Sequence, residues 1–173
     1  MSDVFNANMV AFMKADLAAV DRKVTPWVIA LVHKDWRMQP DAYAAFNSVL
    51  EAGGVDVLFC GHVHYYNRYA PFDAVTNDVD NAAVSADGHT YTNPKYMVTI
   101  VSGASGYVEK DDSCGAGGSP SLTCSENYGW GILVPVNATV ATWSFHTVTA
   151  DGPGPKDYSD TLTIVTDHRV SRL

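Results

Sequence analysis

The stretch DVLFCGHVH, residues 56–64, decides the fold more than any other part of the chain. Its first five residues are a short, largely apolar run, which is typical of a strand buried in a parallel sheet. A glycine and two histidines, His62 and His64, follow directly. In open α/β sheets, ligand sites lie just beyond the carboxyl ends of the strands. Because imidazole is a good ligand for zinc, iron and copper, the stretch predicts a metal site at the end of this strand.

A second apolar segment, residues 26–32, is followed directly by another histidine, His33. Between the two segments, apolar residues recur at helical spacing, which predicts a helix that begins at Pro40 and stops at Gly53. Strand, helix and strand together form a βαβ unit, in which the two strands are parallel. We therefore expect His33 to leave the sheet at the same edge as the GHVH histidines, so that three imidazoles converge.

Plainer interpretations of these histidines remain open. A His-x-His pair in a globular chain is more often part of a polar surface loop than a metal site. The position of His33 at the end of a matching strand strengthens the metal interpretation. The remaining histidines lie in polar or alternating segments, and we expect them to be solvated or hydrogen-bonded structural residues: His89, His146 and His168.

The rest of the chain predicts a second run of strands. After residue 71 the composition turns polar until about residue 92, and we expect a long loop there. Hydrophobic periodicity and turn residues predict the other elements: a helix over about residues 9–20, a strand over 96–101, a hairpin of 132–136 with 140–148, a turn at 151–155 and a strand over 161–166. The expected fold is α/β (α+β), with a βαβ unit followed by mostly antiparallel strands.

Composition bounds the class of protein. With 173 residues, 47% of them hydrophobic and 17% charged, the chain is expected to fold around a core. A net charge of −8 argues against a nucleic-acid partner, which requires a basic face. No apolar run is long enough for a membrane span, and no signal peptide is recognisable at the start of the sequence.

Four longer stretches resemble a known family: residues 12–33, 52–71, 95–107 and 127–146. They read FMKADLAAVDRKVTPWVIALVH, AGGVDVLFCGHVHYYNRYAP, KYMVTIVSGASGY and NYGWGILVPVNATVATWSFH. These stretches are similar to the second half of the purple acid phosphatases, a branch of the calcineurin-like metallophosphoesterases. The resemblance implies the C-terminal half of a β-sandwich flanked by helices. Residues 1–72 would end the metallophosphoesterase domain, and residues 73–173 would form the family's C-terminal iron/zinc phosphatase segment.

The resemblance also assigns metal ligands. His33 stands at the histidine of the family's V-x-x-H motif, which reads ALVH here, and the G-H-x-H motif is complete in residues 61–64. By this resemblance His33 and His62 bind one metal, and His64 binds its neighbour in a dinuclear centre of iron with zinc, manganese or iron. The family's remaining ligands lie in D-x-G, G-D-x-x-Y and G-N-H-[DE] motifs, which this sequence lacks. Three imidazoles alone are expected to hold at most one metal.

The activity implied by the resemblance is hydrolysis of phosphate monoesters by a metal-activated hydroxide in a complete acid phosphatase. Two alternatives are a truncated, non-catalytic fragment that binds at most one metal and a secreted binding module. No histidine lies between residues 33 and 62, where the family usually has substrate-contacting histidines. Side chains near the metal motifs are the candidates for substrate binding: Lys34, Arg37, Tyr43, Tyr65 and Arg68. Arg68 could instead anchor its loop through a carboxylate.

Further features fit the secreted, extracellular or vacuolar location that the resemblance implies. Residues 137–139 form a glycosylation pattern at Asn137. Cys114 and Cys124 flank a glycine-rich loop and could form a disulfide, whereas Cys60 fits a small core residue better than a ligand. Half of a β-sandwich would also expose a sheet edge, and the chain could self-associate through this edge.

Overall fold

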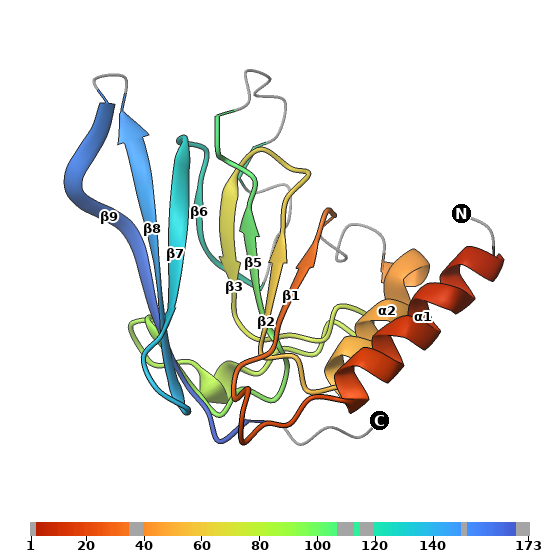
Figure 1. Ribbon diagram of the computed structural model, residues 1–173. Coiled ribbons are helices and arrows are strands. Elements are labelled where there is room, and N and C mark those ends of the chain that lie inside the picture. The colour runs from red at the N-terminus through yellow and green to blue at the C-terminus, as the bar shows by residue number, and fades with distance from the viewer. Residues whose placement is uncertain (1–2, 35–39, 107–112, 115–119, 150–151, 169–173) are drawn as a thin grey trace.

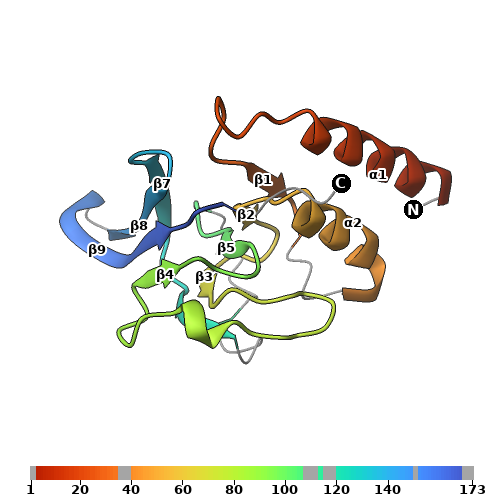
Figure 2. The ribbon, with the colours of Figure 1, turned by 90° about the horizontal axis from the view of Figure 1, so that it is seen from below.

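The computed structural model describes residues 3–34, 40–106, 113–114, 120–149 and 152–168, which form three layers (Figures 1 and 2). Two helices cover one face of a five-stranded sheet, and a four-stranded sheet covers its other face. In chain order the elements are α1 (Asp3–Ala18), β1 (Ile29–Val32), α2 (Pro40–Ala52), β2 (Val57–Cys60), β3 (Tyr66–Tyr69), the 3₁₀ helix η2 (Asn81–Ala83), β4 (Thr90–Thr92), β5 (Val98–Ser102), β6 (Ser121–Ser125), β7 (Gly129–Pro135), β8 (Val140–Thr149) and β9 (Gly152–Val165).

The first sheet has the strand order β1-β2-β5-β3-β6. Its strands β1, β2 and β5 are parallel, and α2 connects β1 to β2, so the expected βαβ unit is confirmed. Strand β3 runs antiparallel to both β5 and β6. The second sheet has the order β4-β9-β8-β7, in which β7, β8 and β9 form an antiparallel meander. The predicted fold class, α/β (α+β) with a βαβ unit followed by mostly antiparallel strands, is therefore confirmed, and the structure shows that the strands form two mixed sheets.

Apolar side chains fill both spaces between the layers. One cluster packs the helices against the first sheet, and a second cluster lies between the two sheets. Where α1 meets the end of α2, a Cβ atom on Gly53 would lie 2.5 Å from Leu17 Cδ1, so only glycine permits this close packing. Among the described residues, no helix is long and apolar enough to cross a membrane.

Several elements differ from the sequence-based expectation. Strand β3 was not expected, because its sequence YNRY is polar, yet all four of its residues are buried. The expected loop between residues 72 and 92 contains η2 and β4. The expected turn at residues 151–155 is wrong from Gly152 onward, where β9 already pairs with β8, whereas Asp151 lies outside the described residues. In each case tertiary pairing overrides a weak local preference.

Candidate functional site

Two of the predicted metal ligands meet at the edge of the first sheet. His33 follows β1 directly, and His62 follows β2 after one glycine. Because β1 and β2 are parallel neighbours, both histidines emerge at the same edge. His33 Nε2 lies 3.1 Å from His62 Nδ1, and the two ring centroids are 4.9 Å apart.

A hollow of about 540 Å³ opens beside these rings. His33, His62 and His64 line one part of it, and the loop after β5 lines the rest with Gly103, Ser105 and Gly106. The hollow therefore collects residues from the carboxyl ends of three adjacent parallel strands, where α/β sheets bind their ligands. The sequence predicted the histidines, but not that the loop after β5 forms a wall of the hollow.

Backbone contacts hold the three loops together. The Gly61 N–H donates to the His33 carbonyl oxygen at 3.0 Å, and the Gly103 N–H donates to the Tyr65 carbonyl oxygen at 3.1 Å. A Cβ atom on Gly103 would lie only 1.8 Å from the carbonyl oxygen of Val63. The loop after β5 can therefore approach the GHVH loop this closely only because residue 103 is glycine.

The backbone of His62 adopts an unusual conformation. Its φ of 69° lies in the left-handed region, which residues other than glycine rarely enter. Such conformations cost free energy and occur preferentially at functional sites, where the surrounding structure maintains them. Here the conformation turns the chain directly after β2 and directs the imidazole toward His33.

The two facing nitrogens fit a shared metal ion. Zinc–imidazole bonds of about 2.0–2.1 Å, at angles between a right angle and a tetrahedral angle, place two ligand nitrogens about 2.9–3.4 Å apart. The 3.1 Å separation of His33 Nε2 and His62 Nδ1 lies within this range. Within the described ranges, however, no group of three histidine, cysteine or acidic side chains is placed to hold a metal alone. The described residues therefore offer two imidazole nitrogens at a spacing that a metal ion could bridge, without a complete set of ligands.

The predicted substrate-binding residues are distributed over different parts of the fold. Lys34 and Tyr43 lie beside His33 in an adjacent hollow of about 620 Å³ between the helices and β1. Tyr65 is buried in the core between the helices and the first sheet. Arg37 lies outside the described residues. Lys34 and Tyr43 therefore share a hollow with His33 but not with His62 or His64, and Tyr65 lies within the packed interior.

Arg68 is part of a buried polar cluster that joins the two sheets. Its guanidinium binds the Asp160 carboxylate through two bonds, Nε to Oδ2 at 2.6 Å and Nη2 to Oδ1 at 2.8 Å. Tyr66 also donates to Asp160, and Arg68 Nη1 donates to the hydroxyl oxygen of Tyr91. We refer to Arg68, Asp160, Tyr66 and Tyr91 as the inter-sheet cluster. Arg68 here anchors its strand through a carboxylate, which is the second of the two roles that its sequence allowed.

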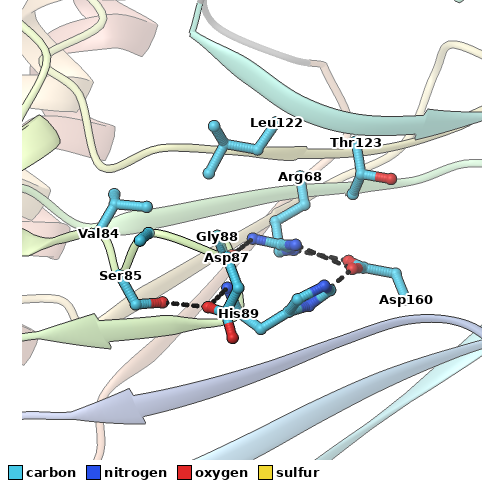
Figure 3. Close-up of a pocket in the computed structure, with 10 residues that line it drawn as sticks. Arg68, Val84, Ser85, Asp87, Gly88, His89, Leu122, Thr123 and Asp160 are labelled. Atoms are coloured by element: carbon cyan, nitrogen blue, oxygen red, sulfur yellow. Dashed lines mark hydrogen bonds and ion pairs between the residues drawn. The ribbon is translucent and has the colours of Figure 1, made fainter.

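Burial in the inter-sheet cluster keeps both phenols protonated. It raises the pKa of Tyr91 to about 12, and burial with the nearby Asp160 charge raises the pKa of Tyr66 further. Figure 3 shows Arg68 and His89 both directed at the Asp160 carboxylate, and all three residues line a hollow of about 460 Å³. Sequence reasoning missed this cluster, since Asp160 stands in a segment without any motif.

The remaining residues singled out in the sequence have structural partners. His89 Nδ1 lies 2.7 Å from the Thr161 carbonyl oxygen, and His146 Nε2 lies 3.1 Å from Ser144 Oγ. His168 Nδ1 lies 3.1 Å from Asp56 Oδ1, in the part of the fold where β2 begins. Cys114 and Cys124 are joined by a disulfide, and Cys60 is a buried thiol in β2.

The arrangement is that of a two-sheet α/β protein with imidazoles at the carboxyl ends of parallel strands. A solved structure with the same fold is purple acid phosphatase PPD1 from yellow lupin (Lupinus luteus) seeds. Its TM-score is 0.71 at 22% identity, with coverage of 91% of this chain and 28% of that chain. No family model matches the sequence.

Sequence identity to curated proteins indicates the family to which the chain is related. An acid phosphatase of Aspergillus ficuum is 32% identical over 76% of this chain and 23% of its own length. Purple acid phosphatase 18 of Arabidopsis thaliana is 32% identical over 87% of this chain and 33% of its own length. Over most of its length, therefore, the chain is homologous to the purple acid phosphatases. It spans about a quarter to a third of the curated relatives that it matches.

Proposed function

We propose that this chain is the part of a purple-acid-phosphatase-type enzyme that contributes three histidines to a dinuclear metal centre. In this proposal the complete enzyme hydrolyses phosphate monoesters. The observation that carries it is the 3.1 Å approach of His33 Nε2 to His62 Nδ1 at the ends of parallel strands. The homology to proteins named acid phosphatases supports the choice of reaction.

Each part of the site then has a distinct task. His33 and His62 hold one metal of an iron-containing pair, with zinc, manganese or iron as the second metal, and His64 holds that neighbour. When bound, such metals lower the pKa of a water molecule so that hydroxide is available to attack phosphorus near neutral or acidic pH. Gly106, in the loop after β5, has no side chain, and nothing lies within 4 Å of the place that a Cβ atom would take, so a phosphate group could approach the backbone closely there. Lys34 and Tyr43, which line the hollow next to His33, are the candidates for contacting the substrate.

A second candidate function is supported by one specific observation. The described residues contain no three-ligand group, and a catalytic metal requires three protein ligands or more with an open position for substrate. On this account the chain binds a single metal through His33 and His62 without turning over phosphate esters. Metal binding and hydrolysis, measured on the same protein, distinguish the two functions.

The location of the protein is proposed on separate grounds. Asn137, the proposed glycosylation site, is exposed in the turn between β7 and β8. Disulfides such as Cys114–Cys124 form and persist mainly in oxidising compartments. We therefore infer that the protein is secreted or vacuolar. Digestion of the natively produced protein with a glycosidase should reduce its mass, and an unchanged mass would contradict glycosylation.

The function is tested by hydrolysis of p-nitrophenyl phosphate, in the presence of iron and zinc, by the complete enzyme that the proposal assumes. We expect His62→Asn to lower metal-dependent hydrolysis by about 100-fold or more, because a ligand is lost. Asparagine is chosen because it tolerates the left-handed backbone at residue 62. His146→Asn is the control, since His146 stacks on Trp130 in the second sheet. Unchanged hydrolysis in His62→Asn would contradict the metal role, and metal binding without hydrolysis in the wild type would establish the non-catalytic alternative.

A further inference from the structure

His62 lies at the centre of a three-residue turn. The Val63 N–H donates to the Gly61 carbonyl oxygen at 2.9 Å, so this hydrogen bond closes a ring with His62 as its central residue. Such γ-turns exist in two forms, and the form whose central residue has a positive φ is rare and strained. The φ of 69° at His62 identifies the strained form.

The residue types in the turn do not explain its conformation. Glycine is the residue that adopts a positive φ without steric cost. Glycine stands beside the strained position, at residue 61, and not in it. A histidine in a strained conformation persists only when the surrounding structure holds it there. The cause of the turn therefore lies in contacts from outside it.

Contacts with both neighbouring strands fix the chain on either side of His62. Before the turn, the Gly61 N–H donates to the carbonyl oxygen of His33, the residue after β1, at 3.0 Å. After the turn, the Val63 carbonyl oxygen packs so closely against Gly103, the residue after β5, that a Cβ atom there would lie 1.8 Å away. The Val63 side chain is only 3% exposed and belongs to the cluster between the helices and the first sheet. Relaxing His62 to a negative φ would therefore disturb contacts with β1, with the loop after β5 and with the core.

The strained turn determines where the His62 ring lies. It directs Nδ1 to a position 3.1 Å from His33 Nε2, a spacing that one metal ion can bridge. A group that is already ordered in its binding position loses less freedom on binding, and this raises affinity. The free-energy cost of ordering His62 then falls on the folding of the chain and not on the binding of a metal.

We propose that the contacts at Gly61 and Val63 impose the strained turn on the metal-free chain, which gives up folding stability to hold the His62 imidazole ready for a metal ion. The part of this inference that concerns the metal rests on the proposed function. The part that concerns the turn does not, so the two can be tested separately. Stability and metal binding make opposite demands on residue 62, since glycine suits the backbone and histidine suits the metal.

Urea denaturation of the zinc-free chain tests the turn, through a comparison of glycine with alanine at two positions. His62→Gly and His62→Ala both remove the imidazole, so they differ only in the Cβ atom and in backbone freedom. The unfolding equilibrium constant of His62→Gly should be about 3-fold or more below that of His62→Ala, because glycine adopts a positive φ without strain. His64 is the matched control, since it is not among the residues with a positive φ. There the order should reverse by about 2- to 5-fold, because glycine loses more freedom on folding. The same order at both positions would overturn the proposal.

A nuclear Overhauser measurement on the wild type tests whether the fold or the metal imposes the turn. A positive φ brings the amide and α hydrogens of one residue close together, so His62 should give a strong effect between them both without zinc and with it. An effect that becomes strong only when zinc is added would overturn the proposal. Zinc titration tests the proposed function separately. If the glycine and alanine variants behave as expected but the wild type binds no zinc, the preformed turn is upheld and the proposed function is contradicted.

Discussion

Replacing Arg68 by methionine should lower the free energy of unfolding by about 3–5 kcal/mol, because Asp160 is then left as an unpaired buried charge. The side chains of Arg68 and Asp160 are each only 2% exposed, so the carboxylate would be left largely desolvated without the guanidinium. The variant also removes the donor to Tyr91 and leaves Tyr66 as the remaining donor from β3 to Asp160 in β9. Urea denaturation of wild type and variant measures the difference.

A comparison with a second ion pair isolates the effect of burial. Arg22 pairs with Asp56, but the Arg22 side chain is 21% exposed, and we expect Arg22→Met to cost about 1–2 kcal/mol. The double replacement Arg68→Met with Asp160→Leu should recover much of the lost stability, since no unpaired charge remains. Equal losses in Arg68→Met and Arg22→Met would contradict the role assigned to the inter-sheet cluster.

The substitution Gly103→Ala should have the second large effect. The added methyl group would lie 1.8 Å from the Val63 carbonyl oxygen, so the loop after β5 must move away from the GHVH loop. We expect a loss of about 3 kcal/mol in the free energy of unfolding, together with weaker metal binding, because the movement separates the walls of the histidine hollow. Urea denaturation and zinc titration of the same samples measure both effects.

Gly61→Ala provides the matched control in the same site. A Cβ atom on Gly61 would lie 3.7 Å from the His33 carbonyl oxygen, which is an ordinary contact distance. Its cost should therefore stay below about 1 kcal/mol. If both glycine variants lost the same stability, the close approach at Gly103 would not be the cause.

Local sequence patterns were sufficient for the first part of the fold. The apolar runs of β1 and β2 and the helical spacing of α2 are properties of adjacent residues, and the parallel arrangement follows from their order along the chain. The meeting of His33 and His62 follows from that arrangement as well. These elements could be predicted because each depends on residues close together in the sequence.

The inter-sheet cluster could not be predicted in this way. Arg68 and Asp160 are 92 positions apart, and neither belongs to a periodic apolar pattern. Strand β3 is buried because its polar groups find partners on the opposite sheet, and those partners become visible only in three dimensions. The close approach at Gly103 is likewise a property of two loops, and no feature of its own segment indicates it.

Zinc titration by calorimetry tests whether His33 and His62 bind the same metal ion. The account predicts one zinc ion per chain for the wild type. It also predicts that His33→Ala and His62→Asn each abolish this binding. His89→Ala should leave zinc binding unchanged, because His89 lines a different hollow, together with Asp160. Absence of zinc binding in the wild type, or binding that survives both variants, would contradict the account.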